Sequence, residues 1–125
     1  MATTDPMTDE QSEPPIFNKT IAIELAGGKQ ALAEELMGML LERLAEDKAL
    51  IKQSFNAKDT DQFHHHVHKL HGAACYCGTP KLKQVSHDLE TAIKLKDDDQ
   101  IAALYQDLLD VIDQLIALDK DTLFM

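Results

Sequence analysis

The feature of this sequence that most limits its fold is a regular spacing of apolar residues near the carboxyl end. Between residues 99 and 118 apolar side chains recur every three or four positions, at Ile101, Leu104, Leu108, Val111, Leu115 and Leu118. A strand would alternate at every second position, so this spacing predicts an amphipathic helix that buries one stripe. Such a helix is stable only when that stripe packs against other apolar surfaces.

Three further segments repeat this pattern, and a shorter one precedes them. The spacing predicts helices over residues 29–56, 61–77 and 80–96 and a short helix over residues 16–26, with Asn18 as its N-cap. Short loops between long helices make sequential neighbours antiparallel. We therefore expect an all-α fold, an antiparallel up-down four-helix bundle with a short additional N-terminal helix.

The rest of the chain falls outside this pattern. With 125 residues the chain is long enough for one domain with a single core. Residues 1–15 are polar and acidic and hold three prolines, so we expect a disordered N-terminal tail or a linker remnant there. The bundle is expected to occupy residues 16–119, and residues 120–125 are expected to form a C-terminal tail.

Charge and hydropathy limit the kinds of partner that the protein can bind and indicate where it is located. The net charge is −10, from 12 basic and 22 acidic residues, which argues against a nucleic-acid backbone or an anionic membrane surface. No apolar run approaches the length of a membrane span, and the N-terminus lacks a basic-then-apolar signal pattern. We expect a cytoplasmic location, with Cys75 and Cys77 as free thiols.

One face of the predicted helix over residues 61–77 gathers groups that can do chemistry. His64, His68, His71 and Cys75 stand at i, i+4, i+7 and i+11, on one side of that helix. His68 projects away from the apolar stripe and should face solvent. Gly72, one turn later, leaves space beside it.

Three interpretations of this face remain open. The side chains can simply be the solvated surface of a helical protein-interaction module. Adjacent pairs such as His64 and His68, or His71 and Cys75, can share a zinc ion in a zinc-binding bundle, although the whole row is too long for one ion. Finally, a neutral imidazole is a good nucleophile near pH 7, and its attack on a phosphorylated carboxylate gives a phosphoramidate that can pass the group onward.

The run from His68 to Gly72 (HKLHG), followed by Gly78, resembles the motif of the histidine-containing phosphotransfer (HPt) family. The longer run HKLHGAACYCGTPKL is similar to the C-terminal HPt domain of hybrid sensor kinases of the BarA/GacS type. The similarity extends over residues 16–118, nearly all of the expected bundle.

The resemblance implies roles for individual residues. His68 would accept and donate the phosphoryl group, Gly72 would let the partner approach, and Gly78 would close the helix. The family often has Gln or Glu 22 positions after its histidine, and here that residue is Glu90. We predict that Glu90 accepts the Nδ1–H of His68, which leaves Nε2 as the nucleophile.

The sequence departs from the family's pattern at one position. The usual basic residue three after the phosphorylated histidine is His71 here, which carries charge only when protonated. Lys69 can add cationic charge on the other side of His68. His64 and Cys75 flank the site, and no metal ligand set is expected.

The resemblance therefore implies a phosphorelay intermediate without an ATP site or a cofactor of its own. Its partners would be the receiver domain of a hybrid sensor kinase and the receiver domain of a response regulator, which supply the Mg²⁺. We expect a monomer when the domain is isolated. Whether it stands alone or is the cytoplasmic C-terminal domain of a membrane-bound kinase is left open.

Overall fold

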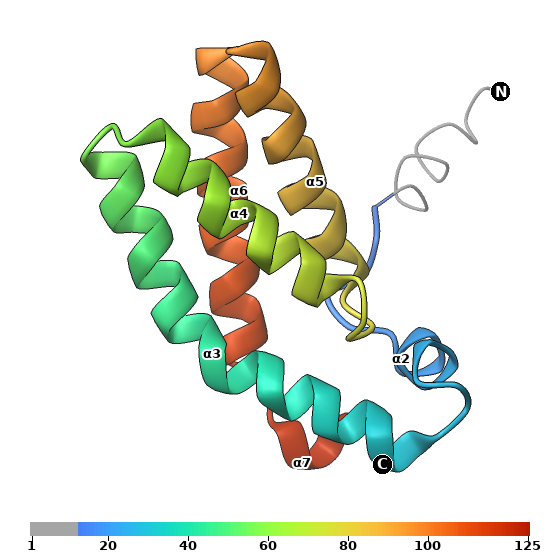
Figure 1. The fold of residues 1–125 in the computed structure, drawn as a ribbon. Coiled ribbons are helices and arrows are strands. Elements are labelled where there is room, and N and C mark those ends of the chain that lie inside the picture. The colour runs from blue at the N-terminus through green and yellow to red at the C-terminus, as the bar shows by residue number, and fades with distance from the viewer. Residues whose placement is uncertain (1–12) are drawn as a thin grey trace, which may run out of the picture.

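The computed structural model describes residues 13–125, and all regular secondary structure among them is helical (Figure 1). The elements are α2 (Lys19–Leu25), α3 (Gln30–Asn56), α4 (Thr60–Ala74), α5 (Pro80–Leu95), α6 (Asp98–Ile116) and α7 (Lys120–Leu123). Helix α3 packs on α4, α4 on α5, α5 on α6, and α6 returns to α3. This closed ring of sequential neighbours is an up-down four-helix bundle, so the predicted fold class is confirmed.

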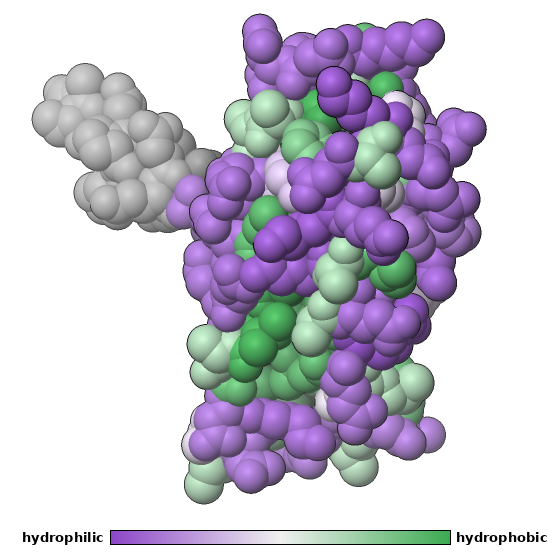
Figure 2. Space-filling view, turned by 90° about the vertical axis from the view of Figure 1, so that its left-hand side faces the viewer, coloured by the Kyte–Doolittle hydropathy of each residue, from purple (hydrophilic) through white to green (hydrophobic). Residues whose placement is uncertain are grey.

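The apolar stripes of the four long helices meet in one core. The most deeply buried side chains are Met37, Leu44, Ile51, Val67, Leu70, Leu82, Leu89, Leu108, Val111, Ile112 and Leu115. On the side where α3 lies, hydrophilic residues cover most of the surface, and hydrophobic ones show mainly in its lower half (Figure 2). None of the helices within residues 13–125 is long and apolar enough to cross a membrane.

Most helices begin at a residue whose side chain satisfies a free amide of the first turn. Asn18, Asp59 and Asp97 each accept a hydrogen bond from the amide three positions on, at 2.9, 3.2 and 3.2 Å. Helix α5 instead begins with Pro80, which has no N–H to satisfy. The N-cap expected at Asn18 is confirmed.

The turn between α4 and α5 differs from the expectation. Helix α4 ends at Ala74, not Cys77, so Gly78 does not close it. The Thr79 hydroxyl donates to the Ala74 carbonyl (3.4 Å), which satisfies one of the carbonyls left free at the helix end. Gly78 has φ of 69°, and a Cβ at this position would lie 2.5 Å from the Cβ of Ala22. The contact with α2, as well as the turn, therefore requires the glycine.

The expected N-terminal tail, residues 1–15, lies mostly outside the described residues. Its last three residues pack against the start of α5. The Pro15 carbonyl accepts a hydrogen bond from the Lys81 amide (3.1 Å), and Glu13 forms an ion pair with the Lys81 ammonium (3.6 Å). This contact satisfies an amide in the first turn of α5.

Residues 120–125 belong to the folded unit, in contrast to the expected C-terminal tail. Asp119 caps the single turn of α7, and Phe124 is buried after it. The Phe124 ring meets Phe17 edge-on, with centroids 5.4 Å apart, and its carbonyl accepts from the Gln30 side chain (3.2 Å). One helical turn is too short to produce an apolar period, which is why the sequence pattern did not indicate it.

Candidate functional site

The centre of the site is one carboxylate of α5 that lies beside the histidine face of α4. The Glu90 side chain is 9% exposed, and its Oε2 lies 2.8 Å from His68 Nδ1 and 3.2 Å from His64 Nε2. Its Oε1 lies 3.5 Å from His71 Nδ1. Three histidines of one helix face thus surround a single carboxylate from the neighbouring helix.

His68 has a side chain that is 70% exposed although one of its nitrogens is bound inward. Since an ionised carboxylate only accepts hydrogen bonds, Nδ1 must carry the proton, and a neutral ring then has its lone pair at the outward-facing Nε2. Among the described residues, a Cβ added at Gly72 would meet nothing within 4 Å. The arrangement presents a nucleophilic nitrogen to solvent with open space beside it.

Core packing sets the rotation of both helices about their axes. Val67 and Leu70 are buried in α4, which turns His68 to the opposite, exposed side. Leu89 is fully buried in α5, and Glu90, the next residue, is carried to the edge of the core that faces α4. The apolar stripes therefore bring the carboxylate and the imidazole together.

The surroundings of Glu90 and His71 shift the pKa of each side chain and so set the charge that it carries at neutral pH. Burial raises the pKa of Glu90, but the hydrogen bonds from His68 and His64 outweigh it and hold the pKa below its usual value. Burial lowers the pKa of His71; Glu90 opposes this effect, and the charge of Lys83 adds to it. At neutral pH the carboxylate is ionised and His71 is uncharged, so His71 does not replace the family's permanent cation.

The remaining site residues expected from the sequence lie further out. The Cys75 thiol is at the end of α4, 3.9 Å from His71 Nε2. Lys69 faces the α3 side of α4: burial raises the pKa of Asp47 on α3, and nearby positive charges, that of Lys69 among them, oppose it. The Glu90 carboxylate therefore lies close to the three histidines, whereas Lys69 lies elsewhere.

Two residues of α5 at this site were not expected from the sequence. The His87 ring lies beside that of His71, with centroids 5.6 Å apart, and Lys83 is close enough to influence the His71 pKa. Lys83, His87 and Glu90 stand at i, i+4 and i+7, the spacing that the three histidines have on α4. Two stripes with the same spacing on antiparallel neighbouring helices can face each other. This shared spacing is the sequence signal that could have pointed to Lys83 and His87.

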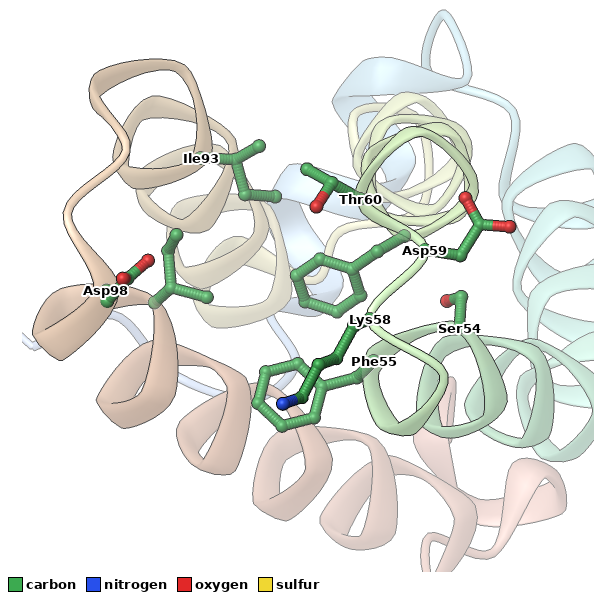
Figure 3. A pocket seen from close by; sticks show the side chains of 9 residues that line it. Ser54, Phe55, Lys58, Asp59, Thr60, Ile93 and Asp98 are labelled. Atoms are coloured by element: carbon green, nitrogen blue, oxygen red, sulfur yellow. The ribbon is translucent and has the colours of Figure 1, made fainter.

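Other candidate sites offer less chemistry. Within residues 13–125 no group of three His, Cys, Asp or Glu side chains is arranged to hold a metal ion. A pocket of 260 Å³ opens at the end of the bundle where the α3–α4 and α5–α6 turns meet, and Phe55 is prominent in it (Figure 3). The Phe55 ring stacks on Tyr105 at 3.8 Å, and the Ser54 hydroxyl donates to the Leu50 carbonyl. The pocket is thus the aromatic end of the core.

Comparison with known protein families agrees with this geometry. The sequence profile of the Hpt domain matches residues 35–119, which include α4, α5 and every residue of the histidine face. The chain belongs to the Hpt domain family. Members of this family are the phosphotransfer modules of phosphorelays, so family membership favours phosphoryl transfer over the interaction-module and zinc-binding interpretations.

Curated relatives of this Hpt domain include much longer proteins. Sensor histidine kinase GacS of Pseudomonas protegens is 37% identical over 89 residues, which cover 71% of this chain and 10% of that protein. Signal transduction histidine-protein kinase BarA of Escherichia coli is 28% identical over 97 residues, 76% of this chain and 10% of that protein. The chain therefore spans about a tenth of the length of these relatives.

A solved structure is similar to this Hpt domain as well. It is the HPt domain of a hybrid sensor histidine kinase from Shewanella, with a TM-score of 0.68 and 30% sequence identity. The alignment covers 80% of this chain and 90% of that one. The resemblance inferred from the HKLHG run is confirmed.

Proposed function

We propose that His68 is the phosphorylated residue of this Hpt domain and that it carries phosphoryl groups between two receiver domains. The donor would be the receiver domain of a hybrid sensor kinase, and the acceptor that of a response regulator. The proposal rests on one observation, the 2.8 Å contact between His68 Nδ1 and Glu90 Oε2 on a ring that is 70% exposed. That contact sets the tautomer that transfer needs while the reactive nitrogen stays accessible.

The step uses the Nε2 lone pair of neutral His68. This nitrogen attacks the phosphorus of an aspartyl phosphate, the N–P bond forms, and the P–O bond breaks so that the electron pair leaves with the aspartate carboxylate. Nδ1 keeps its proton and shares it with Glu90 only as a hydrogen bond. The positive charge of the phosphorylated imidazole then faces a buried carboxylate, which stabilises it, and the same step in reverse passes the group to the second receiver.

The surroundings of His68 suit a transient protein partner. A shallow apolar groove between α3 and the end of α4 is lined in part by Met39, Ala73 and Tyr76, and Ala73 directly follows Gly72. Met39 and Tyr76 are exposed. We propose that a receiver domain covers the groove and His68 together, and that it brings the Mg²⁺ needed to handle its aspartyl phosphate. As part of such a relay the domain would work in the cytoplasm and as a monomer, without a kinase site of its own.

Label transfer from a phosphorylated receiver domain tests the assignment. The full chain is incubated with a receiver carrying radioactive phosphate, and the label it takes up should be labile in acid and stable in alkali, as expected for a phosphoramidate. The His68→Gln protein should take up no label. His64→Gln and His71→Gln proteins should still be labelled.

The controls separate this proposal from its alternatives. Label that persists in the His68→Gln protein would place the phosphoryl group on another residue and refute the assignment. Absence of label in the wild type, together with stoichiometric zinc by elemental analysis, would refute phosphoryl transfer in favour of metal binding.

A further inference from the structure

We infer that His64, one turn before His68, is a positioning residue whose Nε2–H holds the Glu90 carboxylate where it fixes the His68 tautomer. The inference deepens the proposed function and rests on it where transfer rates are concerned. It starts from one observation: the two histidines bond the same carboxylate oxygen, His64 Nε2 at 3.2 Å and His68 Nδ1 at 2.8 Å.

The shared oxygen places the two rings in opposite tautomers. A neutral imidazole has a single N–H, and an ionised carboxylate can only accept. His64 presents Nε2 to Glu90 and must carry its proton there, whereas His68 presents Nδ1 and must carry its proton on that nitrogen. One buried oxygen thus orders both rings, and only His68 has a free Nε2.

His64 lies in the right place for a supporting role. Its side chain is 35% exposed, half the value for His68. The two rings stand edge to face with centroids 6.3 Å apart, so His64 packs beside the nucleophile and leaves its outer face open. A partner that approaches Nε2 of His68 does not need to touch His64.

Glu90 depends on this second donor. A buried carboxylate is costly unless hydrogen bonds compensate for lost water. His71 Nδ1, at 3.5 Å from Oε1, is too far away for a good hydrogen bond. Without His64 the carboxylate would keep one short bond, that to His68, and would be freer to rotate away from it.

Loss of the His64 donor would change the protonation of the His68 ring and so the availability of its reacting nitrogen. A Glu90 carboxylate that has rotated away would no longer accept from Nδ1 of His68, and nothing would then hold the proton on that nitrogen. The ring would then carry its proton on Nε2, and the lone pair needed for attack would face inward. His64 would therefore influence transfer without touching the phosphoryl group.

The test compares two replacements of His64 in the full chain. His64→Phe keeps the ring shape and removes the donor, whereas His64→Gln keeps an N–H near the position of Nε2. Long-range ¹H–¹⁵N NMR near pH 8 reports the tautomer of His68 with no partner present. The His64→Phe protein should lose the predominance of the Nδ1–H tautomer at His68 and accept phosphoryl groups about ten to a hundred times more slowly, as expected for loss of one hydrogen bond to a charged group. The His64→Gln protein should match the wild type in both measurements.

Two further variants make the result decisive. His65→Phe makes the same replacement at an exposed neighbour that does not contact Glu90, and it should change neither measurement. His64→Leu also lacks a donor and should behave like His64→Phe, which guards against a folding defect specific to the larger ring.

The inference is overturned if the His68 tautomer is unchanged in the two donor-less variants, or if His64→Gln behaves as they do. Failure of the proposed function would look different, because wild-type protein would then take up no label from any receiver. The tautomer measurement needs no partner, so it decides the role of His64 in either case.

Discussion

Gly72 is the residue whose presence is hardest to explain by stability alone. It lies inside α4, where glycine is less favourable than alanine because its backbone loses more freedom on folding. A Cβ there would meet nothing within 4 Å among residues 13–125, so no neighbour in that part of the chain requires the glycine. We therefore propose that its value lies in what approaches from outside, next to His68.

The Gly72→Ala protein should be more stable and less active. Its free energy of unfolding should rise by about 0.5–1 kcal/mol, the usual helix-propensity difference. Its rate of phosphoryl acceptance should fall by roughly tenfold or more, because a methyl group displaces the partner from the attacking nitrogen. Urea denaturation and label transfer measure the two effects, and Gln106→Ala, at an exposed position of α6 away from α4, serves as a control for transfer. A stabilised variant with an unchanged rate would show that Gly72 does not serve access.

His71 should make stability depend on pH. Burial lowers its pKa below the ordinary value of 6.5, so in the window just below 6.5 the unfolded chain binds the proton and the folded chain does not. Stability should therefore fall as the pH drops through that window. Between about pH 7.5 and about pH 5.5 the wild type should lose more of its free energy of unfolding than the His71→Gln protein does. Equal losses in urea titrations at the two pH values would contradict this expectation.

At the scale of elements, the turn between α4 and α5 is fastened to α2. The Asn18 amide donates to the Gly78 carbonyl (3.0 Å), and Gly78 packs directly on the backbone of Ala22. The short N-terminal helix thus braces the turn that sets where α5 begins.

Gly78→Ala should be among the most damaging single substitutions in the chain. It adds a left-handed alanine and a clash with α2, so the free energy of unfolding should fall by about 3 kcal/mol or more. Gly27 is the matched control, because its φ is 70° but a Cβ there would meet no atom of the described part of the chain within 4 Å. Gly27→Ala should cost only the conformational part, about 1–2 kcal/mol. Similar losses for both variants would mean that the contact with Ala22 contributes nothing.

At the scale of the whole molecule, the last residues close the lower end of the bundle. Phe124→Ala removes a buried ring from its contact with Phe17 and should lower the free energy of unfolding by about 3–5 kcal/mol. Met125, which is exposed, provides the control, and Met125→Ala should change stability by less than about 0.5 kcal/mol. Thermal or urea denaturation measures the stability of both variants. Equal stability would mean that residues 120–125 add nothing to the folded unit, as expected of a tail.

The sequence predicted what periodicity and local chemistry determine. The four long helices follow from apolar spacing, and the pairing of His68 with Glu90 follows from the family's motif. The sharing of one carboxylate oxygen with His64 was not predictable, because it depends on how α4 and α5 rotate against each other. The packing of Phe124 was missed for a related reason, since it depends on a contact with Phe17 in the segment before α2. The end of α4 at Ala74 was missed because the apolar spacing continues past it to Cys77.

Because the contact between His68 and Glu90 joins two helices, the chemistry of His68 depends on the axial register of α5 against α4. The buried positions of α5 repeat every three or four residues, so a slip of one turn, about 5.4 Å, would keep much of the apolar seam. It would nevertheless bring Ser86 or Lys94 opposite the imidazole in place of the carboxylate. The bracing of Gly78 by α2 therefore does more than stabilise a turn. It fixes the axial position of α5, and a domain that folded with α5 one turn out of place would keep its bundle and lose its phosphoryl chemistry.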